Sequence, residues 1–188
     1  MPVPTLYAPR RFGDNRGWFS ESYNARTLAE AGIAEPFVQD NHSYSAQPGT
    51  LRGIHFQIPP YAQAKLVRCI RGRIWDVAVD LRAGSPTYGI WQGAELSAEN
   101  GHQLYVPVGF GHAFITLTPD CEILYKVSDY YAPEHENGIC WDDPELAITW
   151  PVEGEPTLSA KDAALPRLAA LASPFAFEGQ PFHEIKVL

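Results

Sequence analysis

Short segments in which hydrophobic and polar residues alternate recur through the middle of the chain, and turn residues separate them. Alternation with a period of two is typical of β-strands that have one buried face. The pattern predicts strands at residues 37–39, 51–57, 64–70, 74–81, 89–96, 103–106, 112–118 and 122–131. Because no helical segment lies between these strands, we expect an antiparallel sandwich or barrel of the jelly-roll kind.

The first quarter of the chain has a different pattern. Residues 18–23 alternate well enough to predict a further strand after a turn-rich entry. Asn24 can cap a short helix that follows this strand, and Gly32 can end it. The fold class that we expect is therefore mainly β, with short flanking helices.

The last quarter is harder to assign. Ser159 can cap a helix that continues through residues 164–171. Residues 173–188 mix proline, glycine and aromatic residues, and the pattern gives this C-terminal tail no element. The chain has 188 residues, of which 45% are hydrophobic, and these values suit one domain with a packed core. We expect a single jelly-roll domain over residues 1–188.

Alternation also predicts which side chains share a face. On residues 74–81, Asp76 lies on one face, and the opposite face carries the larger apolar residues, which are Trp75, Val77, Val79 and Leu81. On the last predicted strand, Tyr125 and Tyr131 share a face. A small barrel with histidine, aspartate and tyrosine side chains on its inner face would hold a polar cavity rather than a filled core.

His55 lies within the mostly apolar segment LRGIHFQ. An imidazole titrates at about pH 6.5, so a half-buried one that faces a cleft is suited to act as a general base. The alternative is a core histidine that is hydrogen-bonded to a backbone carbonyl. Strict alternation places Arg52 on the face opposite His55, so Arg52 reaches the same cavity only if Gly53 bends the strand. Otherwise it would serve the pocket of a partner subunit.

Composition excludes several classes of function. The formal net charge of -8 argues against a nucleic-acid binder, because phosphate backbones need a basic face. No apolar run approaches the roughly 20 residues that span a bilayer, and the N-terminus lacks the pattern of a signal peptide. Three cysteines without a CxxC pair argue against disulfides and a cysteine-built zinc site. We expect a cytoplasmic protein that binds neither nucleic acid nor membrane.

Residues 101–112 resemble the second signature of the cupins, a jelly-roll superfamily, with Thr116 where that signature has asparagine. Metal-binding cupins carry an earlier His-x-His followed by glutamate, whereas this chain has only His55 there. We therefore expect no metal and no cofactor. The remaining imidazole, carboxylate, ammonium and phenol groups suit proton transfer at a carbon next to a carbonyl. GxSxG, GxGxxG and P-loop motifs are absent from the sequence.

Several motifs in order resemble the dTDP-4-dehydrorhamnose 3,5-epimerases, over residues 10–168. They are RGWFSESY, QDNHS, LRGIHFQ, AKLVRCIRGRIWDVAVDLR, ELSAENGHQLYVPVGFGHAF, LYKVSDYYAPEHENGICWDD, ITWP and LSAKDAALP. The resemblance implies a cupin-type jelly-roll barrel that forms a homodimer. It also implies cofactor-free epimerisation of a dTDP-linked 4-keto-6-deoxyhexose at C3 and C5, from dTDP-4-dehydro-6-deoxy-D-glucose to dTDP-4-dehydro-L-rhamnose.

The resemblance also implies roles for individual residues. His55 corresponds to the general base, Asp162 to the carboxylate that orients it, and Asp76 to a second acidic neighbour. Tyr125 matches the proton donor on the second face of the sugar ring. Lys65 matches the cation beside the C4 oxygen. An arrangement of this kind resembles the orienting role of aspartate in hydrolase triads.

Further residues match contacts to the ligand. His112 matches a contact to the sugar, and Tyr131 matches the aromatic that stacks on thymine. The remaining nucleotide and sugar contacts are Arg16, Phe19, Glu21, Gln39, Asp40, Asn41, Arg52, Glu136 and Lys161. The departures are Phe56, where the family often has tyrosine, and Ala113, where it often has glycine. Neither departure removes a chemical group from the implied reaction.

Three other functions stay open at this point. A relative could invert only one centre, C3 or C5, of a deoxysugar. From another class, the chain could be a non-catalytic barrel that binds a sugar nucleotide. A metal-dependent cupin oxygenase is the third alternative. For the single residues the alternatives are structural, since an aspartate or glutamate in a loop is usually a solvated charge and a tyrosine is often part of the core.

Overall fold

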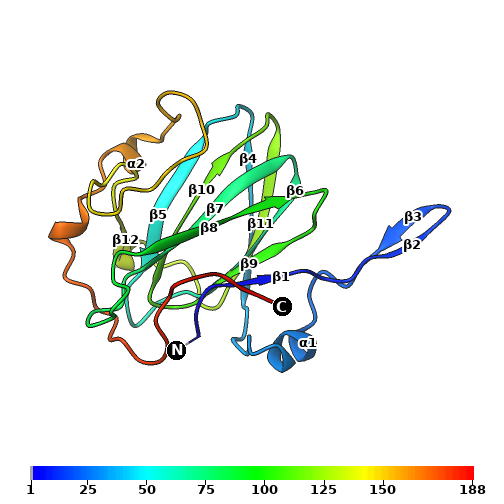
Figure 1. The fold of residues 1–188 in the computed structure, drawn as a ribbon, viewed down its shortest axis with the longest axis horizontal. Helices are drawn as coiled ribbons and strands as arrows, with labels where there is room; N and C mark the ends of the chain where they lie inside the picture. Colours follow the sequence, from blue (N-terminus) through cyan, green and yellow to red (C-terminus); the bar gives the residue numbers. More distant parts are fainter. Residues whose placement is uncertain (1) are drawn as a thin grey trace.

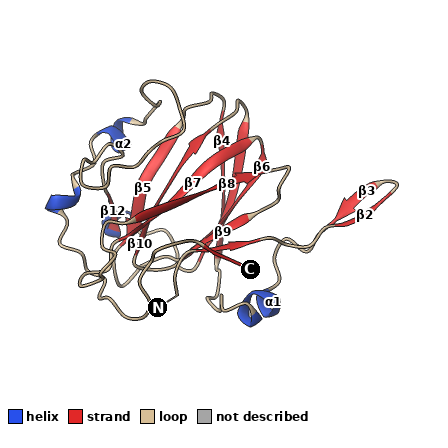
Figure 2. Ribbon diagram, in the orientation of Figure 1, coloured by secondary structure: helices blue, strands red, loops and turns tan. Residues whose placement is uncertain are grey.

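The computed structural model describes residues 2–188, and this part of the chain is mainly β (Figure 2). Two sheets pack face to face as a jelly roll (Figure 1), as predicted. The six-stranded sheet has the order β13 (Lys186–Val187), β1 (Thr5–Tyr7), β9 (Gln103–Val106), β6 (Lys65–Arg71), β11 (Cys121–Val127) and β4 (Gln39–Ser45). The five-stranded sheet has the order β12 (Glu136–Gly138), β5 (Leu51–Gln57), β10 (Phe110–Thr116), β7 (Arg73–Asp80) and β8 (Trp91–Ser97).

The smaller elements lie at the edges of the sheets. A separate hairpin projects from the body of the molecule (Figure 1). It consists of β2 (Phe12–Asp14) and β3 (Gly17–Phe19). The helices are α1 (Ala25–Glu30) and α2 (Ala160–Ala163), together with the 3₁₀ segments η1 (Pro133–His135) and η2 (Leu168–Ala170).

The predicted helix caps are present, but one helix is shorter than predicted. The side chain of Asn24 accepts hydrogen bonds at the start of α1, and that of Ser159 accepts one from the backbone N–H of Asp162. The second helix ends at Ala163 instead of continuing to Leu171. Pro166 explains the difference, because proline disfavours helical backbone at the residue before it and interrupts the helix it would enter.

Three predicted strands differ from the observed ones by more than two residues at one end, and the others agree to within two residues. The strand predicted at residues 37–39 is β4, which begins at Gln39 and runs to Ser45. The prediction missed most of it because both faces of β4 are polar, so hydrophobic and polar residues do not alternate along it. The strand predicted at residues 18–23 ends at Phe19, where the hairpin ends. The strand predicted at residues 122–131 ends at Val127, so Tyr131 lies in the following segment.

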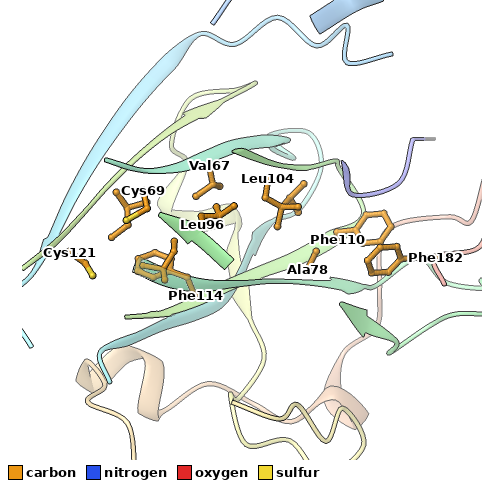
Figure 3. Close-up of a cluster of buried hydrophobic side chains, with 12 residues drawn as sticks. Val67, Cys69, Ala78, Leu96, Leu104, Phe110, Phe114, Cys121 and Phe182 are labelled. Atoms are coloured by element: carbon orange, nitrogen blue, oxygen red, sulfur yellow. The ribbon is translucent and has the colours of Figure 1, made fainter. Parts of the chain in front are cut away.

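A hydrophobic core lies between the two sheets (Figure 3). Val67 and Leu104 of the six-stranded sheet pack there against Ala78 and Phe110 of the five-stranded sheet. Phe182, from the tail that the sequence pattern left unassigned, is fully buried in the same cluster. Burial of these side chains is the main favourable term that holds the sheets together.

The outer face of the five-stranded sheet is also buried. The predicted apolar face of β7 lies here, because Val77 and Val79 pack against Leu146, Leu168 and Phe175 of the C-terminal third. Asp76 therefore lies on the opposite, inner face, as alternation predicts. The C-terminal third thus covers the sheet and brings α2 to the end of β5, with which it is in contact.

A bulge in β5 places Arg52 on the inner face. His55 pairs with His112 of β10 and Arg52 pairs with Phe114, so three steps along β5 match two along β10. Gly53 is the residue that permits this, with a φ of +118°. A Cβ atom there would lie 2.6 Å from both the carbonyl oxygen of His112 and the Cβ atom of Ala113. The sequence predicted that Arg52 would reach the face of His55 only if Gly53 bends the strand, and the strand is bent there.

We expect the substitution Gly53→Ala to destabilise the protein by about 2–4 kcal/mol, because it adds overpacking against β10 to a left-handed backbone conformation. Gly49→Ala is the matched control, since Gly49 has a φ of +74° but no atom within 4 Å of an added Cβ. It should cost about 1 kcal/mol. Urea unfolding of both variants measures the difference. Equal costs would show that contact with β10 does not constrain the bulge.

Candidate active site

A polar cavity of about 360 Å³ lies between the sheets, beside the hydrophobic core. An adjoining hollow of about 260 Å³ shares five of its lining residues, which are His55, Lys65, Tyr125, Tyr131 and Glu136. Strands β5 and β10 form one wall, and β4, β6 and β11 form the other. The predicted polar cavity is therefore present, and it brings together side chains from both sheets, α2 and β12.

His55 is hydrogen-bonded to a carboxylate rather than to a backbone carbonyl. Its Nε2 atom lies 2.5 Å from Oδ1 of Asp162. Burial alone would raise the pKa of the Asp162 carboxyl, but the hydrogen bond and charge of His55 lower it below its ordinary value. An ionised carboxylate only accepts hydrogen bonds, so in the neutral imidazole Nε2 carries the proton and Nδ1 keeps its lone pair. That tautomer is the one in which His55 can accept a proton.

The cap of α2 fixes the position of Asp162. The backbone N–H of this residue donates to Oγ of Ser159 at 3.0 Å, and its side chain is almost fully buried. The helix therefore presents the carboxylate to His55 from a segment far along the chain. The cap thus fixes the backbone from which the carboxylate reaches His55.

Asp76 is hydrogen-bonded to a different imidazole from the one that the resemblance implies. Its Oδ1 atom lies 2.7 Å from Nε2 of His112, and both side chains are buried. Burial lowers the pKa of His112 despite the opposing charge of Asp76, and the charges of Lys65 and His55 lower it further. His112 is therefore neutral at neutral pH. Asp76 has the direct role of holding His112 rather than His55.

Lys65 supplies a buried ammonium to the cavity. Its Nζ atom lies 3.5 Å from the carbonyl oxygen of His55. Burial lowers the pKa of Lys65 to about 8, although the charges of Asp76 and Glu136 oppose the shift. The group is therefore still mainly protonated at pH 7, and it is lost as a cation when the pH rises above about 8.

Tyr125 faces the cavity from β11, on the sheet opposite His55. Burial raises the pKa of its phenol, the charge of Arg52 opposes this shift, and that of Glu136 adds to it. The phenol therefore keeps its proton well above neutral pH. A proton acceptor and a proton donor thus line one cavity from opposite walls, which is the arrangement that inversion at a carbon centre requires.

Three polar side chains form a connected group at the cavity. The phenol of Tyr131 donates to Oε2 of Glu136 at 2.7 Å, and Nζ of Lys161 lies 2.6 Å from Oε1. Burial would raise the pKa of Glu136, but these two hydrogen bonds lower it, so the carboxyl is ionised. Tyr131 thus reaches the same cavity as Tyr125 although it is not on the strand.

Arg52 connects the two walls of the cavity. Its Nη2 atom donates to the carbonyl oxygen of Tyr44 at 3.1 Å and lies 3.4 Å from Oγ of Ser45. The bulge at Gly53 thus directs the guanidinium toward β4. A guanidinium in this position can bind oxyanions with its remaining donors.

Of three predicted ligand contacts on β4, two face the cavity and the third, Asp40, faces away from it. Gln39 and Asn41 line the cavity, as alternate residues on one face. The side chain of Asp40 points to the other face, where its Oδ1 atom lies 2.8 Å from Nζ of Lys126. The structure therefore does not bring the Asp40 carboxylate to this cavity.

Residues on the hairpin and just after it also lie away from the cavity of their own chain. The side chain of Arg16 is 84% exposed and pairs with Asp14 at 2.5 Å. Phe19 is exposed, and the carboxylate of Glu21 accepts from the side chain of Asn24. None of these three predicted contacts lines the cavity of its own chain.

Some lining residues were not among the predicted contacts. They are Ser43, Phe56, Gln57, Gln63, Phe114 and Ser159. Alternation would have found Gln57, which shares the face of His55. Ser43 follows Gln39 and Asn41 on the same face of β4, in the part of that strand that the sequence pattern missed. The sequence pattern predicts Ser159 as a helix cap but does not predict that it lines the cavity.

Residues 2–188 contain no group of three or more histidine, cysteine, aspartate and glutamate side chains that could hold a metal ion. The two imidazoles of the cavity each bind a carboxylate instead. In the same part of the chain, no helix has the length and apolar character needed to cross a bilayer.

Comparison with known proteins assigns the family. A family model described as dTDP-4-dehydrorhamnose 3,5-epimerase matches residues 3–170. The chain belongs to this family. A dTDP-4-dehydrorhamnose 3,5-epimerase of Pseudomonas aeruginosa is 56% identical over 163 residues, which are 86% of this chain and 89% of the relative. The resemblance inferred from the motifs is therefore confirmed, and the chain is a member of an isomerase family.

Solved structures of this family have the same fold. One is a dTDP-4-dehydrorhamnose 3,5-epimerase from Bacillus anthracis with TDP and PPi bound, at a TM-score of 0.86 and 53% identity over 88% of this chain and 94% of that one. Another is a dTDP-6-deoxy-D-glucose-3,5-epimerase from Legionella pneumophila in complex with dTDP-4-keto-L-rhamnose, at a TM-score of 0.86 and 44% identity over 92% of both chains. The cupin-type fold class is confirmed.

Proposed function

We propose that this member of the epimerase family inverts both C3 and C5 of dTDP-4-dehydro-6-deoxy-D-glucose and forms dTDP-4-dehydro-L-rhamnose, without a cofactor. The observation that carries the proposal is the placement of His55 and Tyr125 on opposite walls of one cavity, with the ammonium of Lys65 lining the same space. Family membership limits the substrate class to nucleotide-linked 4-keto sugars. The cavity supplies the acid and base that such a reaction needs.

The first step is removal of a proton from carbon. The C4 carbonyl of the substrate acidifies the hydrogens on its two neighbours, C3 and C5, and His55 accepts the proton through its free nitrogen. The electron pair of the broken C–H bond moves onto the C4 oxygen and forms an enolate. The carboxylate of Asp162, 2.5 Å from Nε2, stabilises the imidazolium that results.

Lys65 stabilises the enolate. A cation in a buried cavity lowers the energy of a developing oxyanion more than it would in water, because the surrounding dielectric constant is low. Lys65 keeps its charge at neutral pH, with a pKa of about 8. The neutral His112, which is held by Asp76, is a further contact for the sugar in the same cavity.

The second proton transfer comes from the opposite wall. Tyr125 donates its phenolic proton to the carbon of the enolate on the face away from His55, and the C4 carbonyl re-forms. Donation to that face inverts the configuration. The raised pKa of the buried phenol keeps Tyr125 protonated and ready to donate. Solvent then takes the proton from the His55 imidazolium and returns one to the Tyr125 phenolate, so that the same pair can act on the second carbon in a further enolisation.

The remaining cavity residues bind the nucleotide and the sugar. We assign the thymine to the ring of Tyr131, and the diphosphate to Arg52, because the planar guanidinium binds oxyanions bidentately. Gln39, Asn41, Glu136 and Lys161 supply polar contacts around them. A polar lining of this kind suits a charged sugar nucleotide better than an apolar ligand.

We also propose that the protein is a homodimer in which the hairpin of one subunit completes the cavity of the other. The hairpin exposes the aromatic side chains of Phe12, Trp18 and Phe19, which is unfavourable in a free monomer. Arg16 and Glu21 lie near them, away from the cavity of their own chain. Contact with a partner would bury the aromatics and bring Arg16 to that partner's nucleotide. The Asp40 carboxylate, on the outer face of β4, is not assigned to the ligand.

Two further assignments follow the sequence analysis. We propose that residues 1–188 form one domain, with the tail as part of it, because Phe182 is buried between the sheets and β13 pairs with β1. The three cysteines are free and buried, which suits a protein of the cytoplasm, where thiols stay reduced.

Turnover of dTDP-4-keto-6-deoxyglucose in deuterated water tests the proposed reaction. We expect deuterium at both C3 and C5 of the inverted sugar, because the original proton leaves on His55 and the hydrogen that replaces it comes from the phenol of Tyr125, which carries deuterium in deuterated water. His55→Ala should lower exchange at both carbons by at least about 100-fold while dTDP still binds. Mass spectrometry and NMR of the product measure both effects.

Lys126→Ala is the control for these measurements, since Lys126 pairs with Asp40 on the far side of β4 from the cavity. It should leave exchange unchanged. Deuterium at a single carbon would identify a one-centre epimerase instead. Binding of dTDP without any exchange would leave a non-catalytic sugar-nucleotide-binding barrel.

Mixing two inactive variants tests the shared cavity. His55→Ala and Arg16→Ala chains should each be weakly active alone, whereas a mixed dimer has one cavity with both wild-type residues. Random exchange of subunits should therefore restore about a quarter of the wild-type sites. Sedimentation velocity verifies that mixed dimers form. A monomeric wild-type protein, or mixed dimers without regained activity, would contradict the proposal.

A further inference from the structure

The contacts of the Tyr131 side chain are too few to hold its ring in place. The residue follows the end of β11, and 55% of its surface is exposed, so core packing does not hold its ring. The phenol has one partner, the carboxylate of Glu136. A single exposed hydrogen bond is a weak constraint on an aromatic ring. The backbone on both sides of Tyr131 must supply the rest.

Gln57 holds the backbone on both sides of that ring. Its Nε2 atom donates to the carbonyl oxygen of Tyr130 at 3.2 Å, and its Oε1 atom accepts from the N–H of Ala132 at 2.8 Å. Nε2 also donates to the carbonyl oxygen of Tyr61 at 2.6 Å. One amide therefore joins the residues before and after Tyr131 to the strand that carries His55.

These contacts use both N–H donors of the Gln57 amide. The side chain is also buried, with only 4% of the residue exposed. A primary amide has two N–H donors, and here both are bound to backbone carbonyls. Gln57 therefore has no donor left for a ligand, although it lines the cavity two residues after His55.

A second glutamine holds the remaining backbone group. The N–H of Tyr131 donates to Oε1 of Gln39 at 3.3 Å. Residues 130–132 are thus fixed at successive backbone groups by side chains from β5 and β4. A third glutamine, Gln63, makes a different contact, since its Nε2 atom donates to the carbonyl oxygen of Asp129 at 2.7 Å. Gln63 holds the loop but does not bracket Tyr131.

We propose that Gln57 is a positioning residue that holds the ring of Tyr131 in place for the base of the nucleotide. It acts through the backbone of residues 130–132 and makes no contact with the base itself. The proposal rests on the proposed function, which assigns the base to Tyr131. It adds that the strand carrying His55 also fixes the site of base recognition, so that sugar and base are held relative to one rigid element.

The test is a double-mutant cycle between Gln57 and Tyr131, with dTDP as the ligand in calorimetry. Gln57→Met keeps the volume and removes all three hydrogen bonds. We expect it to weaken dTDP binding about tenfold, because the ring is no longer held where the base binds. In a Tyr131→Ala background the same change should have less than about a twofold effect, since no ring is left to position.

Three controls separate positioning from general damage. Gln63→Met removes a hydrogen bond from the same loop without releasing Tyr131, so it should weaken dTDP binding less than Gln57→Met does. In Gln57→Met, KM should rise about as much as the dissociation constant, while kcat stays within about threefold, because His55 and Tyr125 are not displaced. Inorganic pyrophosphate, which has no base, should bind both proteins equally.

Amide hydrogen exchange tests the contact without any ligand. The peptide that contains Ala132 should exchange faster in Gln57→Met, which removes the acceptor of the Ala132 N–H. Gln57→Glu is an isosteric variant that keeps this acceptor but cannot donate to the carbonyls of Tyr61 and Tyr130, so it should protect Ala132 better than Gln57→Met does. Failure of wild-type protein to bind dTDP would contradict the proposed function, whereas unchanged exchange at this peptide would overturn the role of Gln57.

Other outcomes also count against the proposal. An equal loss of dTDP affinity in the Tyr131 and Tyr131→Ala backgrounds would mean that Gln57 does not act through Tyr131. Equal effects of Gln57→Met and Gln63→Met would reduce Gln57 to one of several loop contacts. Loss of the folded state in both Gln57 variants would make it a determinant of the fold.

Discussion

The hydrogen bond between His55 and Asp162 is the interaction on which the site depends. It joins His55 of β5 to Asp162 of α2, which is 107 residues further along the chain. The two groups meet only because the C-terminal third packs on the outer face of the five-stranded sheet and carries α2 to the end of β5. A catalytic pair built in this way needs the complete fold, and it fixes the tautomer of the base before any ligand binds.

The same fold keeps charged groups between two sheets without filling the space with apolar side chains. Each imidazole of the cavity has a carboxylate partner, and Lys65 lies beside both pairs with a pKa of about 8. Burial of an ammonium is unfavourable, and the charges of Asp76 and Glu136 offset part of that cost. The cavity is therefore organised before the substrate arrives, which is what stabilisation of an enolate requires.

Much of this arrangement could be predicted from the sequence, and the exceptions have identifiable causes. Alternation placed Asp76 on the inner face, but it could not show that Asp76 binds His112, because that pairing depends on the register between β7 and β10. It missed most of β4, whose two faces are both polar. The face of Arg52 depended on a bulge at Gly53, which sequence could name as a condition but not decide.

The account rests on a base and an acid acting from opposite walls, and isotope exchange by Tyr125→Phe tests this most directly. In deuterated water the variant should still incorporate deuterium at C3 or C5 within about threefold of the wild-type rate, since His55 can remove a proton and return a deuteron to the same face. Formation of the inverted sugar should fall by at least about 100-fold. Equal loss of exchange and inversion, or inversion at the wild-type rate, would contradict the account.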